Sequence, residues 1–261
     1  MPEWFTDVPT AVSLLAFLGF FLLFAAGGVM IFRRVSRLIF GMEGEWRDLA
    51  TLCLQAGVTF FALLLALLSF AAYQNYTEAR IAVSSEAASL AVMYREGSSL
   101  PEPDRGVLQA DLRAYTAHVI NKEWGEHRQG EAPESGQGHV RKIQNGILSF
   151  QGKTPAENNI QSALISAFKD FINARRQRLT AASVGVPGLL WSVLVMGVLT
   201  VIALTWFLPV NRARAHFFLS LSVAFAASLA LYSIVAVDRP FKGSVSVPPT
   251  AFELVLGTTM R

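Results

Sequence analysis

The sequence predicts an all-α membrane protein, in which four transmembrane helices form two hairpins on either side of a helical soluble insert. Apolar residues make up 52% of the 261 residues. They gather in four blocks, at 11–32, 50–73, 185–208 and 216–237, and no block contains Asp, Glu, Lys or Arg. Each block has the roughly 20 residues that a helix needs to cross the hydrocarbon core of a bilayer.

The first hairpin pairs the blocks at 11–32 and 50–73 across the connector "RRVSRLIFGMEGEWRD". No basic residue precedes the first block and no clear small-residue cleavage site follows it, so we expect a membrane span and not a cleaved signal peptide. The second hairpin has the short connector "VNRARA". The chain therefore divides into a first transmembrane hairpin, a helical soluble insert, a second transmembrane hairpin and a C-terminal tail, at 1–73, 74–184, 185–237 and 238–261.

The stretch "FAAYQNYTEAR" (70–80) joins the second block to the insert without Gly or Pro. Beyond it, apolar residues recur every three or four positions, which is typical of one face of a helix. They are Tyr76, Ala79, Val83, Ala87, Leu90 and Tyr94. The second span is therefore expected to continue unbroken to about Glu96. At 1.5 Å per residue, a helix over 50–96 would be about 70 Å long, more than twice the thickness of the bilayer core.

The rest of the insert is also predicted to be helical. The spacing of apolar residues indicates a helix around 107–124 and a short helix near 141–150, separated by a polar Gly-rich loop over 125–139. The tetrapeptide "TPAE" is a capping box, in which Thr154 and Glu157 satisfy each other's backbone amides at the start of a helix. That helix is expected to lead almost directly into the third span. No strand is predicted.

Short motifs along the chain resemble those of the bestrophin-like domain-of-unknown-function family of bacterial membrane proteins. They are Glu86-Ala87, "MYRE" (93–96), "LPEP" (100–103), Tyr115, "EW" (123–124), "TPA" (154–156), "ARRQRL" (174–179) and "DRPFKG" (238–243). The resemblance covers nearly the whole chain. The stretch at 70–80 and the tail at 237–256 are more distantly similar to bestrophin anion channels.

Bestrophins are pentameric anion channels in which the second span lines a pore with a narrow apolar neck. The resemblance implies that this chain forms a homo-oligomer and that the neck lies near Phe60 and Leu64. Calcium gating is not implied, because the acidic run that holds calcium in animal bestrophins is absent. The segment "VDRPFKGS" (237–244) has too few carboxylates for a site with six to eight oxygen ligands.

Small and polar residues form a stripe along the second span, here called the polar stripe. Its members step by three or four positions and are Thr51, Gln55, Thr59, Ala62, Ala66, Ser69 and Tyr73. Polar groups within a membrane tend to face protein or water rather than lipid. One interpretation is a pore wall, with Phe60 and Leu64 as a hydrophobic constriction. The other is a face that packs closely against another span.

A second candidate site is a belt of residues where the chain leaves the membrane. It comprises Tyr76, Glu78 and Arg80 after the second span, and Asp238, Arg239, Pro240 and Phe241 after the fourth. We expect Asp238 and Arg239 to pair with Glu78 and Arg80 in a structural role. Arg175, Arg176 and Arg178 precede the third span and are interpreted as anchors at lipid headgroups. An anion vestibule is the alternative for these three arginines.

Other side chains do not form a recognisable reactive site. His127 and His139 lie near Glu126, Glu131 and Glu134, but the spacing matches no metal-ligand motif. On the helix around 107–124, only Tyr115 and His118 are expected to share a face, and Glu123 is not. We therefore predict no metal.

The composition also excludes several classes of protein. No G-x-S-x-G, H-E-x-x-H or P-loop pattern occurs, so we predict no enzyme, catalytic residue or cofactor. The net charge is +3 and no basic stripe alternates with aromatic residues, so no nucleic-acid partner is expected. The spans hold no carboxylate relay of the kind that proton pumps use. The expected partners are the lipid bilayer, further copies of the chain, and small ions if the protein conducts.

The short connectors predict the orientation in a bacterial inner membrane. They carry six arginines, while the N-terminus has neither Lys nor Arg; the arginines are Arg33, Arg34, Arg37, Arg47, Arg212 and Arg214. By the positive-inside rule, the connectors lie in the cytoplasm. The insert and both termini are then extracytoplasmic, which is opposite to the bestrophin topology. Arg80 and the arginines at 175–178 favour the reverse, but long domains follow the rule poorly.

The sequence thus favours a homo-oligomeric ion channel lined by the second span, anion-selective by analogy alone. The alternative is a non-conducting membrane scaffold or sensor whose soluble helices bind a partner. A channel requires the polar stripe to face water, whereas a scaffold requires it to be packed.

Overall fold

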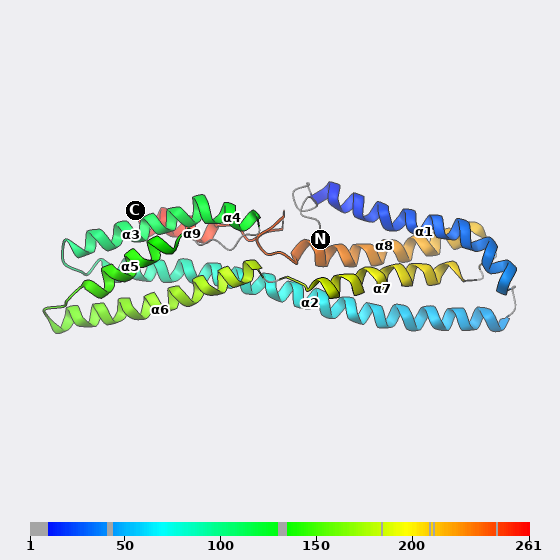
Figure 1. The fold of residues 1–261 in the computed structure, drawn as a ribbon, viewed down its shortest axis with the longest axis horizontal. Coiled ribbons are helices and arrows are strands. Elements are labelled where there is room, and N and C mark those ends of the chain that lie inside the picture. The colour runs from blue at the N-terminus through cyan, green and yellow to red at the C-terminus, as the bar shows by residue number, and fades with distance from the viewer. Residues whose placement is uncertain are drawn as a thin grey trace. The chain divides into compact units, whose positions relative to one another are not determined.

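A computed structural model describes residues 10–40, 44–129, 135–183, 185–208, 210, 212–243 and 245–261. These residues contain no strand, which confirms the predicted all-α class. In chain order the helices are α1 (Thr10–Phe40), α2 (Gly44–Gly97), α3 (Asp104–His118), the π-helical turn η2 (Val119–Glu123), α4 (Trp124–Gln129), α5 (Gln137–Ser149), α6 (Pro155–Ser183), α7 (Gly188–Trp206), α8 (Ala213–Val237) and α9 (Thr250–Thr258) (Figure 1).

The chain forms two compact units. The first comprises Met1–Gln74 and Val186–Asp238, and the second comprises Asn75–Gly185 and Arg239–Arg261. The first unit holds α1, α7, α8 and the first part of α2. The second holds the remainder of α2 together with α3 to α6 and α9. Each unit has its own cluster of buried apolar side chains.

Four helices are long and apolar enough to cross a membrane, as predicted. The candidate spans are Ala11–Phe32, Asp48–Gly97, Gly188–Trp206 and Ala213–Val237. Helices α1, α7 and α8 lie beside one another in Figure 1 and contact one another. Gly28 permits one of these contacts, because a Cβ atom at this position would lie only 1.9 Å from Cε2 of Trp206. The indole therefore occupies the space that any larger residue on α1 would need.

Helix α2 runs without interruption through 54 residues. This confirms the prediction that the helix of the second span continues unbroken to about Glu96. At 1.5 Å per residue its length is about 80 Å. The continuity follows from the sequence, because residues 58–96 contain neither Gly nor Pro and the segment after Tyr73 is rich in strong helix formers such as Ala and Glu.

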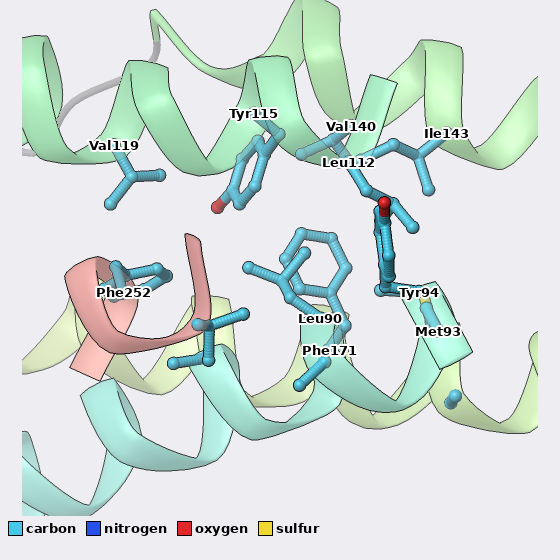
Figure 2. Close-up of a cluster of buried hydrophobic side chains, with 14 of the residues drawn as sticks. Leu90, Met93, Tyr94, Leu112, Tyr115, Val119, Val140, Ile143, Phe171 and Phe252 are labelled. Carbon is cyan, nitrogen blue, oxygen red and sulfur yellow. The ribbon is translucent and has the colours of Figure 1, made fainter. Parts of the chain in front are cut away.

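The second unit is a layer of helices around an apolar core. Leu90 from α2, Leu112 from α3 and Phe171 from α6 point toward one another in Figure 2, and Phe252 from α9 joins them. The predicted capping box at the start of α6 is confirmed. The amide of Glu157 donates to Thr154 Oγ1 at 3.2 Å, and the amide of Thr154 donates to Glu157 Oε2 at 3.2 Å.

The structure departs from the predicted elements in two places. The polar loop is shorter than expected, because η2 and α4 continue the helix to Gln129 and α5 begins at Gln137. The C-terminal tail contains a helix, α9, that we did not predict. It forms directly after Pro249 and buries Phe252 and Val255 in the core of the second unit. Only nine residues long, it is held by this packing rather than by its own propensity.

Candidate functional site

In the part of the chain that the structure describes, most of the polar stripe is exposed at the surface. Thr51, Gln55, Thr59, Ala66 and Tyr73 are exposed, as is Ala62, and Ser69 is half-buried. The hydroxyl of Thr59 donates back to the carbonyl oxygen of Gln55 at 2.8 Å. In the most apolar part of α2 only 11% of the residues are buried, against 22–28% in the other three spans. Helix α2 is thus the span with the largest surface available to lipid, water or other copies.

The inward face of α2 is formed by other residues. Phe61, Leu65 and Ala72 are buried in the core of the first unit. At 100° per residue, their side lies roughly 95° around the helix from the centre of the polar stripe. Gly197 of α7 allows this contact, because a Cβ atom there would lie 2.2 Å from Cε2 of Phe61.

Phe60 and Leu64 do not share the face of the polar stripe. By the same helical geometry they lie roughly 150° and 170° from its centre. Phe60 is 72% exposed and Leu64 is half-buried. Since a pore is lined by one face of a helix, a pore along the polar stripe would not have these two side chains as its constriction.

The charged residues of α2 lie on different faces of the helix. Arg80 and Arg95 are exposed and continue the face of the polar stripe beyond the membrane, whereas Glu78 lies on nearly the opposite side. Glu86 is turned inward and fully buried. At the other end of the span, the exposed Asp48 falls on the stripe face. The face therefore carries one acidic residue before the span and basic residues after it.

A buried network of charged side chains crosses the second unit. At its centre is Arg178 of α6, whose side chain is 0% exposed. Its guanidinium donates to Glu86 Oε2 at 2.6 Å and to Glu86 Oε1 at 3.1 Å. It also donates to Glu123 Oε2 at 2.7 Å and lies 2.5 Å from Nε2 of His127. Arg178 thus joins α6 to α2, to η2 and to α4.

Arg175, one turn earlier on α6, extends the network. It pairs with Glu123 Oε1 at 3.0 Å and donates to the hydroxyl of Tyr115 at 3.0 Å. That hydroxyl in turn donates to Glu86 Oε1 at 2.5 Å. The two arginines and two glutamates balance in charge, which is the condition under which buried ions are tolerated. The prediction that Arg175 and Arg178 anchor at lipid headgroups is therefore wrong, and only Arg176 of the three is exposed.

The π-helical turn η2 explains why Tyr115 and Glu123 act together. In a regular α-helix, each four-residue step rotates a side chain by about 40°, so Glu123 would drift away from Tyr115. The wider turn of η2 offsets this drift and keeps Tyr115, Val119, Glu123 and His127 buried on one side. The expectation that Tyr115 and Glu123 lie on different faces was wrong for this reason. Gly136 completes the site, because a Cβ atom there would lie 2.1 Å from Glu123 Oε1.

The network shifts the pKa values of its members. Burial raises the pKa of Glu123, but the charges and hydrogen bonds of Arg178 and Arg175 outweigh it, so this pKa lies below its ordinary value. Burial and the charge of Glu86 raise the pKa of Tyr115 well above 10. The phenol therefore keeps its proton and donates to Glu86, and Glu123 remains ionised near neutral pH.

Aromatic side chains connect the buried network to the C-terminal tail. The ring of His127 stacks on Phe241 with centroids 4.8 Å apart, and Trp124 packs edge-on against Phe241 at 5.7 Å. Trp124 also donates its indole N–H to the carbonyl oxygen of Val247 at 3.2 Å. The segment after α8 is therefore fixed onto the second unit by Phe241.

The belt residues lie in different surroundings. Pro240 and Phe241 are buried, Tyr76 packs on the core of the second unit, and Glu78, Arg80 and Arg239 are exposed. Asp238 accepts hydrogen bonds from the amide of Val186 at 2.6 Å and from Nε1 of Trp191 at 3.3 Å. These bonds tie the end of α8 to the start of α7. The pairing of Asp238 and Arg239 with Glu78 and Arg80 stays a prediction.

The two histidines considered as metal ligands, His127 and His139, lie in different surroundings. His127 belongs to the buried network, whereas His139 of α5 lies beside His118 of α3 with ring centroids 4.9 Å apart. Ser135 bridges His118 and Glu126 through hydrogen bonds of 3.1 and 2.9 Å. Glu131 and Glu134 lie outside the described residues. Within the described part of the chain, no group of three or more His, Cys, Asp or Glu side chains is arranged to hold a metal ion.

Several of the short motifs found in the sequence contribute to the network. Glu86, Tyr115, the Glu123–Trp124 pair, Arg175 and Arg178 of "ARRQRL", and Phe241 of "DRPFKG" all belong to it or pack against it. A span-forming unit joined to a helical layer with this core defines a class of multi-pass membrane protein.

Comparison with known proteins identifies the class. The sequence profile of the bestrophin-like domain matches residues 19–252, so the chain belongs to the bestrophin-like family. Solved structures of a bacterial bestrophin homolog from Klebsiella pneumoniae have the same fold. One single-substitution variant is 15% identical, with a TM-score of 0.72, covering 95% of this chain and 97% of that one. A structure solved by zinc SAD phasing is 13% identical, with a TM-score of 0.71 and coverages of 94% and 96%. No curated protein is significantly similar in sequence.

Proposed function

We propose that this bestrophin-like membrane protein is a homo-oligomeric ion channel in the bacterial inner membrane, with the polar-stripe face of α2 lining its pore. The main support for this proposal is that Thr51, Gln55 and Thr59 are exposed on an apolar span, although lipid is a poor environment for polar side chains. Copies arranged around an axis would place these side chains in water. The apolar side of α2, which includes Phe60, then faces lipid or a neighbouring copy.

The charges at the end of this face support anion selectivity. Arg80 and Arg95 extend the stripe face, while Glu78 and Glu96 lie away from it. In an oligomer, each arginine position would form a ring of positive charge at one mouth of the pore, which raises the local concentration of anions. The ring formed by Asp48 at the other mouth would have the opposite effect. The proposed selectivity therefore arises at the end of the pore next to the soluble unit.

The exposed basic residues support the predicted topology. With Arg175 and Arg178 buried in the network, they no longer count as charges at the membrane surface. The connectors then carry the stronger positive bias, with Arg212 and Arg214 both exposed. We infer that the connectors are cytoplasmic and that the insert and both termini are extracytoplasmic.

The test combines ion flux with thiol accessibility in liposomes that contain the purified full-length protein. Chloride and potassium gradients are imposed separately. In a Cys53→Ala background, Ala66→Cys is expected to react with a charged, membrane-impermeant thiol reagent and to lose flux when modified. Phe60→Cys, on the apolar side of the same helix, is the matched control and should remain unreactive.

The alternative function is a non-conducting scaffold or sensor whose soluble helices bind a partner. It would be supported by liposomes that stay tight to both ions although the protein is a folded oligomer. In that case Ala66→Cys should be as unreactive as Phe60→Cys, because the polar stripe is packed between copies.

A further inference from the structure

A cavity of about 430 Å³ opens between α2 and α6 on the second unit, in the size range of small-ligand sites. Asn75, Glu78 and Ile81 line it from α2, and Arg176, Gln177 and Thr180 line it from α6. It therefore combines one carboxylate and one guanidinium with amide and hydroxyl groups. A ligand that carries both a negative and a positive charge matches this lining.

The predicted end of the second span places the α2 side of the cavity at the level of the lipid headgroups. Asn75 and Glu78 follow Tyr73, the last residue of the apolar block, by about 3 and 7.5 Å along the helix. The headgroup region extends roughly 5–8 Å beyond the hydrocarbon core on each side. On α6, Thr180 is only eight residues before Gly188, where α7 begins. The residues of both walls thus lie close, along the chain, to a predicted membrane span.

The cavity is separate from the face assigned to the pore. Glu78 lies roughly 150° around α2 from the centre of the polar stripe. Arg176 is exposed, and its guanidinium makes no hydrogen bond or ion pair with the described residues. It is therefore available to a ligand, unlike Arg175 and Arg178, which are held in the buried network.

We propose that this cavity binds the headgroup of a zwitterionic phospholipid with a primary ammonium group, such as phosphatidylethanolamine. Arg176 donates to the phosphate, for which its planar guanidinium is well suited, and Thr180 supplies a further hydroxyl donor. The carboxylate of Glu78 and the amide oxygen of Asn75 accept hydrogen bonds from the ammonium. Ile81, 57% exposed, offers an apolar surface to the glycerol portion.

The test measures retained lipid on the full-length protein by native mass spectrometry, after exchange into equal mixtures of three lipids with identical acyl chains. Phosphatidylethanolamine is expected to be retained about tenfold over phosphatidylcholine, whose ammonium has no N–H, and over phosphatidylglycerol, which has no ammonium. One hydrogen bond between charged groups gives a preference of this size. Equal retention of the three lipids would overturn the proposal, and a preference for phosphatidylglycerol would replace it with a simple anion site.

Two variants assign the roles of the residues. Glu78→Gln should abolish the preference for phosphatidylethanolamine over phosphatidylcholine but keep binding, whereas Arg176→Gln should lose all three lipids. Lys169→Met, an exposed change on α6 away from the cavity, is the control. If both cavity variants behave like Lys169→Met, the assignment is wrong. Protection of the lipid site by soluble phosphoethanolamine at the same concentration would identify a soluble ligand and overturn the lipid assignment.

Discussion

Replacing Arg178 by methionine is expected to destabilise the second unit severely. The substitution keeps the unbranched apolar stem of the side chain but removes the donors to Glu86 and Glu123, three hydrogen bonds of 2.6–3.1 Å in all. Two buried carboxylates then face a single arginine, Arg175. Breaking a buried ion pair by removing one partner costs about 3–5 kcal/mol, because it leaves an uncompensated charge out of water. For a protein of this size, each kcal/mol lowers the melting temperature by roughly 2–4 °C.

The measurement is thermal unfolding of the purified protein in detergent, followed by circular dichroism at pH 7.5. Arg178→Met should lower the melting temperature by about 6–20 °C. Adding Glu86→Gln should recover part of this loss, because one buried negative charge is removed and the Arg175–Glu123 pair remains balanced. Lys169→Met on the exposed side of α6 should change the melting temperature by little.

Two results would exclude a stabilising role for charge balance in the network. If the melting temperature of Arg178→Met lies within about 2 °C of that of the unmodified protein, the network contributes little to the free energy of unfolding. If Arg178→Met is severely destabilised but Glu86→Gln makes it worse, the loss comes from packing and not from unbalanced charge. Coupling between the two sites of about 0.5–3 kcal/mol is the expected range for residues in direct contact.

Four further outcomes are expected. The pKa of Glu123 in the folded protein is below its ordinary value of 4.5, so its ionised carboxylate stabilises the folded protein fully above pH 4.5. This stabilisation is lost as the pH falls through the lowered pKa, and the melting temperature should fall with it. Burial lowers the pKa of His139 below 6.5, so stability also declines as the pH falls below 6.5, and His139→Asn should remove that part of the pH dependence. Gly28→Val should prevent assembly of the first unit, since its Cβ would overlap Trp206, and size-exclusion chromatography would show aggregation. Arg80→Glu should lower the chloride-to-potassium permeability ratio several-fold in reversal-potential measurements, since each charge contributes about 0.4 kcal/mol at 10 Å in water; an unchanged ratio would place Arg80 outside the ion path.

The parts of the fold that depend on neighbouring residues could be predicted from the sequence. Uninterrupted apolar blocks predict the four spans, the absence of Gly and Pro predicts the length of α2, and "TPAE" predicts the start of α6. Each of these signals is local, because it depends on residues within a few helical turns. Counting 100° per residue likewise puts Phe60 and Leu64 away from the polar stripe, so the sequence itself separates these two predicted pore features.

The buried network could not be predicted in the same way. Arg178 meets Glu86, Glu123 and His127, which are 92, 55 and 51 positions away in the chain. An arginine next to a membrane span is ordinarily exposed, so its charge alone indicates a headgroup contact. The π-helical turn that brings Glu123 into line with Tyr115 has no clear signal in "VINKE". The motif "EW" and the arginines of "ARRQRL" marked the right positions but not their burial.

The placement of these motif residues bears on how family membership should be interpreted. The motif residues Glu86, Tyr115, Glu123, Arg175 and Arg178 are buried in the soluble layer, and their contacts hold it together. A substitution at Thr59 or Ser69 would leave every one of them intact. Recognition of such a chain by its motifs therefore reports a shared architecture, while the face of α2 is free to diverge. Under the proposed channel function, the motifs do not identify the permeant ion, and the stripe residues must be compared separately.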